Sequence, residues 1–212
     1  MLEAVVLDFD GVILDSAVIK TVAFAELFKE EDPAHQRLIL EHHRAHAGIS
    51  RYEKFRWAYR EALKRPLDAA GERVLGERYN AIVEAKVLAA PFIPGALEFL
   101  RSCRLPLFVA SGTPEDELRR IVERRGLAPF FRGVFGSPRR KDAILAGIAS
   151  DLGIPGSSLA MVGDAMTDYE GARSCGAAFI GIVPAGEENS FPAGTTVIPD
   201  LRPLAGVLGL AG

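Results

Sequence analysis

The first apolar run of the chain leads directly into two acidic residues. Ala4 to Leu7 are all apolar, and Asp8, Asp10 and Gly11 follow within four positions. A continuous apolar run that ends at a turn signal predicts a strand buried on both faces. Such strands lie centrally in parallel sheets, and ligands bind beyond their carboxyl ends. The pattern therefore predicts that both aspartates lie at the ligand-binding edge of a sheet.

After Ser16 the apolar positions recur every three to four residues, which is the period of helices. This spacing predicts helices over residues 18–30, 33–46, 51–66 and 69–88. Pro33 and Ser50 are suited to the start of the second and third of these helices. The alternation typical of strands does not occur between residues 17 and 90. We therefore expect residues 16–90 to form an all-helical domain.

Beyond Pro91, short apolar runs alternate with stretches of helical spacing. The runs predict strands over residues 105–110, 133–135, 159–162, 178–183 and 196–198. The stretches around them predict helices over residues 96–102, 114–125, 141–152, 169–174 and 203–210. Such alternation predicts a doubly wound parallel sheet. The expected fold class is α/β, with a Rossmann-like core formed by residues 1–15 and 91–212 and the helical domain inserted after the first strand.

Composition and charge narrow the classes of partner. The 212 residues are 49% apolar and 25% charged, with a net charge of −3, which does not favour a nucleic-acid or anionic membrane surface. The apolar stretches are too short to cross a bilayer, and the first is too short for a signal peptide. Cys103 and Cys175 suggest no disulfide framework or metal site, so we expect them to pack as small apolar residues. We expect a cytoplasmic protein with no nucleic-acid or membrane partner.

The Asp8 and Asp10 pair is the first candidate for chemistry. Two carboxylates so close together cost electrostatic energy unless a cation or a shared proton relieves their repulsion. Hard divalent cations such as Mg²⁺ take carboxylate oxygens as ligands. The pair therefore indicates a magnesium site, and the alternative is a pair of solvated loop aspartates.

Three more polar segments lie at the ends of predicted strands or the starts of predicted helices. Ser111-Gly112-Thr113 offers a hydroxyl and backbone N–H groups at a helix start, which is a suitable anion site. Asp164 and Asp168 follow another predicted strand. Lys141 begins a helix, where a cation opposes the helix dipole. The alternatives are that Ser111 and Asp168 only cap helices and that Lys141 is a surface lysine.

In their order along the chain, these segments resemble the four motifs of the haloacid dehalogenase-like (HAD) hydrolase superfamily. The matching residues are Asp8-Phe9-Asp10-Gly11-Val12 for the first motif, Ser111 for the second, Lys141 for the third, and Gly163-Asp164 with Asp168 for the fourth. Residues 16–90 resemble the helical cap that many members insert after the first motif. Because dehalogenase members lack an acid at the position of Asp10, the resemblance is to the phosphoglycolate phosphatase and beta-phosphoglucomutase branch.

The resemblance implies a role for each motif residue. Asp8 is the implied nucleophile, which forms an aspartyl-phosphate, and Asp10 is the implied acid and base. The implied ligands of Mg²⁺ are Asp8, the Asp10 main-chain carbonyl and Asp164, with Asp168 ligating the ion or orienting its waters. The implied phosphate-binding groups are the Lys141 ammonium, the Ser111 hydroxyl and the N–H groups near Phe9, Gly112 and Thr113.

The third motif departs from the pattern in one position. Many capped relatives follow the motif lysine with proline, whereas Asp142 follows Lys141 here. The preceding Ser137-Pro138 resembles members with a Gly-Ser-Pro-x-x-Lys spacing, so Lys141 is the expected motif residue. Arg139 and Arg140 are the alternatives.

Substrate choice is expected to depend on the helical domain. Gly48-Ile49-Ser50-Arg51 resembles the cap loop of beta-phosphoglucomutase, in which the matching arginine binds the non-transferring phosphate, and the alternative is that Arg51 only begins a helix. Lys20 stands where that mutase has a histidine acid and base. His42, His43 and His46 lack a suitably placed acid, so we expect packing rather than metal binding.

The sequence therefore predicts a Mg²⁺-dependent phosphomonoesterase that hydrolyses a small phosphorylated metabolite, of the phosphoglycolate or sugar phosphate type, through an aspartyl-phosphate. The alternative is a sugar phosphomutase of the beta-phosphoglucomutase type. A more remote alternative is a receiver-like phosphoacceptor module, but receivers are shorter and lack the helical insertion. A non-catalytic scaffold is disfavoured because every motif residue is present. The expected oligomeric state is a monomer or a homodimer.

Overall fold

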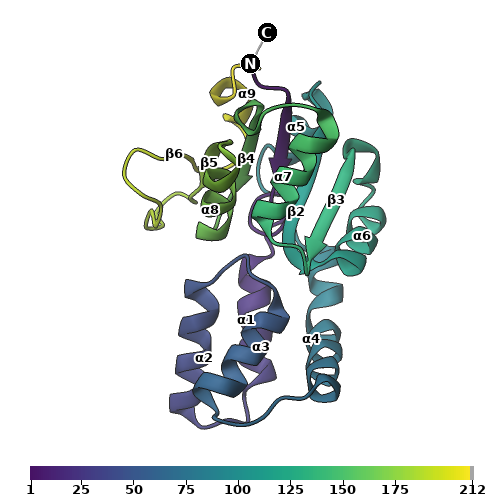
Figure 1. The fold of residues 1–212 in the computed structure, drawn as a ribbon. Coiled ribbons are helices and arrows are strands. Elements are labelled where there is room, and N and C mark those ends of the chain that lie inside the picture. Colours follow the sequence, from purple (N-terminus) through teal and green to yellow (C-terminus); the bar gives the residue numbers. More distant parts are fainter. Residues whose placement is uncertain (211–212) are drawn as a thin grey trace.

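The computed structural model of the chain describes residues 1–210 and contains a single twisted parallel sheet (Figure 1). Its strands are β1 (Ala4–Leu7), β2 (Leu107–Pro114), β3 (Gly133–Ser137), β4 (Leu159–Gly163), β5 (Ala178–Ile182) and β6 (Thr196–Ile198). Their order is β3-β2-β1-β4-β5-β6, and every neighbouring pair is parallel. The predicted doubly wound parallel sheet is confirmed, with the first strand at its centre.

Helices connect the strands and fill the stretch after β1. The helices that follow β1 are α1 (Ala17–Leu27), α2 (Pro33–Ala45), α3 (Arg51–Trp57) and α4 (Ala69–Ala89). The helices around the sheet are α5 (Ala96–Ser102), α6 (Glu115–Arg124), α7 (Lys141–Leu152), α8 (Met166–Cys175) and α9 (Leu204–Val207). The α3 helix continues into a π-helical turn, Ala58–Ala62.

The side chains of β1 alternate between two apolar clusters, one on each face of the sheet. Val5 and Leu7 belong to the cluster that contains residues of α5, α6 and α9, whereas Ala4 and Val6 belong to the cluster with α7 and α8. All four side chains are fully buried. Because both faces of β1 are covered, the strand reads as an unbroken apolar run rather than an alternating one.

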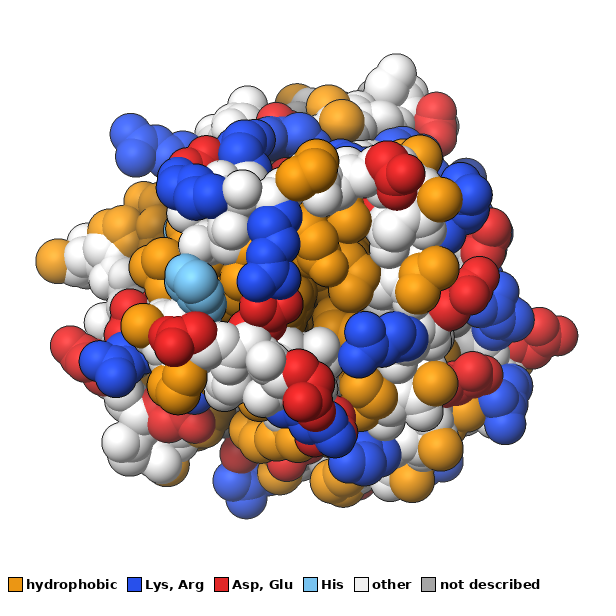
Figure 2. Space-filling model, turned by 90° about the horizontal axis from the view of Figure 1, so that it is seen from below, with side chains coloured by type: hydrophobic (Ala, Val, Ile, Leu, Met, Phe, Trp, Pro, Cys, Tyr) orange, Lys and Arg blue, Asp and Glu red, His pale blue; other side chains and the backbone are white. Residues whose placement is uncertain are grey.

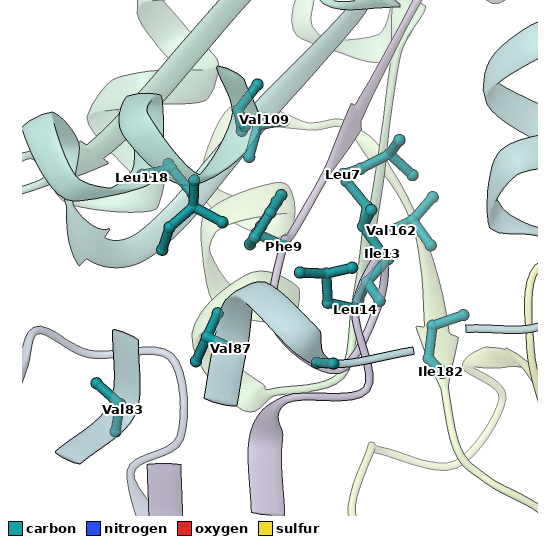
Figure 3. Packing of buried hydrophobic residues seen from close by; sticks show 14 of the residues in the cluster. Leu7, Phe9, Ile13, Leu14, Val83, Val87, Val109, Leu118, Val162 and Ile182 are labelled. Atoms are coloured by element: carbon teal, nitrogen blue, oxygen red, sulfur yellow. The ribbon is translucent and has the colours of Figure 1, made fainter. Parts of the chain in front are cut away.

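The helical segment, residues 16–90, lies beyond the carboxyl ends of the strands (Figure 1). Two adjacent crossings join it to the sheet, and the Asp15 N–H donates to the Pro91 carbonyl at 2.9 Å. The apolar cluster on the Val5 side continues past this junction through Phe9 and Ile13 to Val87 of α4 (Figure 3). The junction thus places the segment directly over the carboxyl edge of the sheet.

Aromatic side chains form the centre of the helical segment. The ring of Phe24 lies 5.5 Å from that of Phe55 and 5.4 Å from that of Tyr79, centroid to centroid. Seen from the side of this segment, basic and acidic side chains are interspersed over the surface (Figure 2). Among residues 1–210, no helix has the length and apolar character needed to cross a membrane. Cys103 and Cys175 are unpaired thiols that pack beside the two apolar clusters.

Candidate active site

The end of β1 positions Asp8. The Asp8 N–H donates to the Val162 carbonyl of the neighbouring strand at 2.9 Å, which fixes its backbone at the sheet edge. Its carboxylate is buried, accepts the Phe9 N–H at 2.7 Å, and lies 3.0 Å from the Lys141 ammonium. Both carboxylate oxygens therefore have a fixed direction, as a nucleophile needs for an in-line attack.

Lys141 and two further aspartates complete this cluster. Lys141 also donates to the fully buried Asp168, and the Ala165 N–H donates to the same carboxylate at 3.1 Å. Asp168 therefore supports the first turn of α8, as the capping alternative expects, and also pairs with Lys141. Arg139 pairs with Glu115 at 2.7 Å, and the Arg140 side chain is exposed beside Asp142, which leaves Lys141 as the cation that contacts Asp8.

Three carboxylates converge next to this lysine. One oxygen each of Asp8, Asp164 and Asp168 lies within 4.8 Å of the others. Burial, together with the charges of Asp8 and Asp168, raises the pKa of Asp164 well above its ordinary value. Burial also raises the pKa of Asp168, although Lys141 opposes the shift. Burial alone would lower the pKa of Lys141, but Asp168 and Asp8 outweigh it and raise that pKa.

The donor set fits a hard divalent cation. When all three carboxylates are ionised, the one ammonium group beside them leaves two negative charges, which a divalent ion such as Mg²⁺ would neutralise. The loop at Gly11 also approaches closely, because a β-carbon at this position would stand 2.1 Å from an Asp164 carboxylate oxygen. The cluster is thus a dense acidic site whose three carboxylates could hold a metal ion.

Asp10 lies apart from this cluster in a hydrogen-bond network of its own. The Ser16 hydroxyl donates to Asp10 at 2.6 Å, the Thr113 hydroxyl donates at 3.0 Å, and Lys20 forms an ion pair with it. Lys20 also donates to the Thr113 hydroxyl at 2.7 Å. Burial would raise the pKa of Asp10, but the Lys20 charge and these hydrogen bonds hold it below its ordinary value.

The predicted phosphate-binding segment follows at the end of β2. The Ser111 hydroxyl is buried and accepts the Thr113 N–H at 3.1 Å. Gly112 faces the loop that precedes α3, since a β-carbon there would stand 2.3 Å from the Gly48 carbonyl oxygen. Ser111, Gly112 and Thr113 all line the same cavity as Asp8.

This cavity, of about 520 Å³, lies between the sheet edge and the helical segment. Its walls include Asp8, Asp10 and Asp164 from the core side and Lys20, Arg51, Lys54 and Tyr79 from α1, α3 and α4. Arg51 is 5% exposed, donates to Glu117 of α6 at 2.8 Å and to Asn80, and stacks 4.4 Å from the Tyr79 ring centre. The structure thus places Arg51 in the cavity wall, already paired with a carboxylate.

The histidines of α2 show packing contacts. The His42 ring stacks on Trp57, with 3.6 Å between centroids, and on His46, with 4.1 Å. His43 is buried instead and faces Lys54 of α3. Within the described residues, the group spaced to hold a metal is formed by the three aspartates and includes no histidine.

Sequence reasoning missed three polar residues of the cavity region. Lys54 lies one helical turn after Arg51, Asn80 bonds Arg51 from α4, and Glu117 neutralises it from α6. The three-residue spacing of Arg51 and Lys54 could have placed both on one face of α3. The partners of Arg51 lie 29 and 66 positions away along the chain, where no local pattern points to them.

Comparisons with known proteins agree with this geometry. The profile of the haloacid dehalogenase-like hydrolase family matches residues 2–176. A phosphoglycolate phosphatase from Chromobacterium violaceum is 30% identical over 122 residues, which cover 55% of this chain and 55% of that protein. The match therefore spans about half the length of this curated relative.

Solved structures share the fold over nearly the whole chain. A predicted phosphoglycolate phosphatase from Haemophilus somnus superposes with a TM-score of 0.75 at 15% identity and 98% coverage of each chain. A candidate beta-phosphoglucomutase from Thermotoga maritima superposes with a TM-score of 0.70 at 20% identity and 100% coverage of each chain. These likenesses establish the fold, and the family profile covers most of the sequence. The chain belongs to the haloacid dehalogenase-like hydrolase family.

Proposed function

We propose that the protein is a Mg²⁺-dependent phosphomonoesterase that acts on a small phosphorylated metabolite. The observation that carries this proposal is the position of Asp8, held between the Phe9 N–H and the Lys141 ammonium in the wall of the cavity between the sheet edge and the helical segment. Asp10 lines the same cavity two residues further on. A phosphoglycolate type of substrate is supported by the name of the curated relative, and a sugar phosphate type remains within the proposal.

The proposed reaction has two displacement steps. An Asp8 carboxylate oxygen attacks phosphorus, the bond to the ester oxygen breaks, and that oxygen leaves with the proton of Asp10. Water then attacks the aspartyl-phosphate at phosphorus and gives its proton to Asp10, which releases inorganic phosphate and restores Asp8. The Lys20 ion pair favours ionised Asp10, which is the form that accepts a proton from water in the second step, so the first step requires Asp10 to take up a proton beforehand.

The remaining groups hold the transferring phosphate. Lys141 supplies positive charge, and the Ser111 hydroxyl supplies a hydrogen-bond donor. The backbone N–H groups of the Ser111–Thr113 loop are available at the same edge of the sheet. Asp8, Asp164 and Asp168 would hold Mg²⁺, with the Asp10 main-chain carbonyl as a further ligand. When bound, the ion would offset the repulsion between the Asp8 carboxylate and the phosphate oxygens.

The helical segment is proposed to act as a cap over this site. Residues 16–90 form a body of helices joined to the sheet by two adjacent crossings, and they supply one wall of the cavity. Enclosure of a small substrate between two such parts excludes water from the reacting groups.

The test is phosphate release from a panel of phosphorylated metabolites, with and without Mg²⁺. We expect wild-type turnover that EDTA abolishes and Mg²⁺ restores, and a loss of about a thousandfold or more in Asp8→Asn, because the carboxylate that attacks phosphorus is gone. Asp151→Asn, at an exposed position of α7, is the control and should match wild type.

Two other results would point away from this function. Absence of phosphate release, combined with isomerisation of a sugar phosphate that a bisphosphate activates, would establish the mutase alternative. Equal release by wild type and Asp8→Asn would refute the proposed nucleophile.

A further inference from the structure

Lys54 is a buried cation in the cavity that the proposed reaction does not use. It lies three residues after Arg51 on α3, is 6% exposed, and lines the same cavity as Asp8, Asp10 and Ser111. A lysine is rarely buried to this degree unless a carboxylate pairs with it.

Lys54 contacts His43, which is a neutral side chain. Its ammonium donates to the His43 carbonyl at 3.2 Å and lies 3.3 Å from His43 Nδ1, while His43 Nε2 lies 3.2 Å from the Thr21 hydroxyl. Burial, helped by the charges of Lys54 and Lys20, lowers the pKa of His43 to about 3. His43 is therefore neutral at physiological pH, and its Nδ1 accepts a hydrogen bond from Lys54.

The other buried or half-buried cations in or beside the cavity each have a carboxylate partner, whereas Arg44, which also lines the cavity, is exposed. Lys20 pairs with Asp10, Arg51 pairs with Glu117, and Lys141 pairs with Asp8 and Asp168. Within residues 1–210, no carboxylate lies within 4.0 Å of the Lys54 ammonium. The wall formed by α3 therefore carries one buried amine that has no carboxylate partner.

The charged groups that face Lys54 do not supply this missing anion. They are Lys20 of α1 and Asp164, which follows β4. Neutral His43 and exposed Arg44, both of α2, line the same cavity. Burial, with the repulsion of Lys20, lowers the pKa of Lys54 to about 7, and Asp164 opposes the shift without cancelling it. An anion placed beside the amine would stabilise its charged form and raise its pKa again.

We propose that Lys54 recognises a second anionic group on the substrate, at the end remote from the transferred phosphate. This inference rests on the proposed phosphomonoesterase function and specifies its substrate class. The substrates are then phosphomonoesters that also carry a carboxylate or a second phosphate, and two of the three ammonium protons remain committed to His43 while the third meets this anion.

The experiment uses matched substrates that differ only in the group at the end remote from the transferred phosphate. One series contains the O-phosphates of ω-hydroxy acids with one to four methylene groups, beginning with phosphoglycolate. The second series contains the ω-hydroxyalkyl phosphates of the same lengths, and the third contains the corresponding alkanediol bisphosphates. The kcat/KM values of wild type, Lys54→Met and Lys54→Arg are compared in the presence of Mg²⁺.

We expect wild type to prefer an anionic series over the neutral alcohols by about tenfold or more at one chain length. Lys54→Met should lose this preference, so that its ratio of kcat/KM for the anionic series to kcat/KM for the alcohols falls towards one through a higher KM for the anionic series, and Lys54→Arg should keep part of the preference. The series that shows the effect identifies the anion as carboxylate or phosphate. Equal wild-type rates on charged and neutral esters, or a preference that survives in Lys54→Met, would overturn the inference.

The same panel separates this inference from the proposed function. Hydrolysis of the neutral esters that depends on Asp8 but shows no charge preference leaves the phosphomonoesterase standing and removes the role of Lys54. If no ester is hydrolysed, calorimetry with the non-hydrolysable ω-phosphono acids and ω-hydroxyalkyl phosphonates decides the point. Preferential binding of the acids that Lys54→Met loses then supports the recognition role, whereas equal binding refutes it.

Discussion

Gly11 shows how closely the two aspartate loops of the site fit together. Its φ angle of +83° lies in the left-handed region, which an L side chain occupies at a cost of about 1–2 kcal/mol. A β-carbon at this position would also stand 2.1 Å from an Asp164 carboxylate oxygen, far inside van der Waals contact. Both the backbone angle and the space therefore require glycine at this position.

Substitution of Gly11 by alanine should damage the metal site more than the fold. We expect Gly11→Ala to weaken Mg²⁺ activation by about tenfold or more, because Asp164 must move away from Asp8. Gly126→Ala is the matched control, since Gly126 has a φ of +68° with no atom within 4 Å of an added β-carbon. It should lose about 1 kcal/mol of unfolding free energy and keep the wild-type response to Mg²⁺. An identical Mg²⁺ response in both variants would contradict the prediction.

The aspartates and Lys54 differ in how far their positions follow from the sequence. Asp8 and Asp164 come directly after apolar strands. Because ligands bind at the carboxyl ends of the strands in a parallel sheet, the sequence predicts that these two aspartates lie close together. Lys54 occupies an ordinary helical position, and its burial without a counter-ion depends on the packing of α2 against α3. That property belongs to tertiary structure, and no local spacing indicates it.

At the scale of elements, the Arg51–Glu117 pair links α3 of the helical segment to α6 of the core. The two charges are nearly buried, with side-chain exposures of 5% and 11%, and one Glu117 oxygen has no hydrogen-bond partner within the described residues. Removal of one member of a buried pair leaves an uncompensated charge, which costs more than the pair itself contributes. The interface is therefore sensitive to single substitutions at this point.

A double-mutant cycle should reveal this coupling. We expect Arg51→Met and Glu117→Gln each to lower the unfolding free energy by about 3 kcal/mol, and the double variant to lose clearly less than the sum. The exposed pair Arg124–Glu84, with exposures of 60% and 51%, is the control and should contribute about 0–1 kcal/mol. Urea unfolding measures all of these values, and additive losses at Arg51 and Glu117 would show that the two residues act independently.

The ends of helices and strands were predicted best where the residues that start or stop the element are close by in the sequence. The expected helix over 141–152 and strand over 196–198 agree with α7 and β6, whereas α8 begins at Met166, three residues earlier than expected. Asp168 explains that difference, because its carboxylate accepts the Ala165 N–H and supports an earlier first turn. The last helix, α9, ends at Val207 rather than at residue 210, since Gly209 has a φ of +69°.

At the scale of the whole molecule, the helical segment and the sheet-containing core differ in their hydrophobic patterns but share one apolar cluster and one cavity. The change from helical spacing to strand alternation at Pro91 separates these parts in the sequence. Their mutual position depends on contacts far apart in the chain, such as the Thr167 hydroxyl with the Ala47 carbonyl at 3.2 Å. The sequence therefore predicts each part, while the cavity between them required the three-dimensional structure.

The buried His43 should make the stability of the whole molecule depend on pH. Its pKa is about 3 in the folded protein against about 6.5 in the unfolded chain, so the unfolded state binds more protons between these values. The stability contributed by neutral His43 is complete above about pH 6.5 and is lost as the pH falls towards 3. At pH 5 this linkage amounts to about 2 kcal/mol relative to pH 7.

Unfolding free energies measured by urea titration at pH 7 and pH 5 test this expectation. His43→Gln removes the titrating group and keeps a polar side chain beside Lys54, so its decrease between the two pH values should be smaller than that of wild type by about 2 kcal/mol. His35→Gln, on the same helix but not buried, is the control and should retain most of the wild-type decrease. If His43→Gln loses as much stability on acidification as wild type, protonation of His43 does not drive the effect.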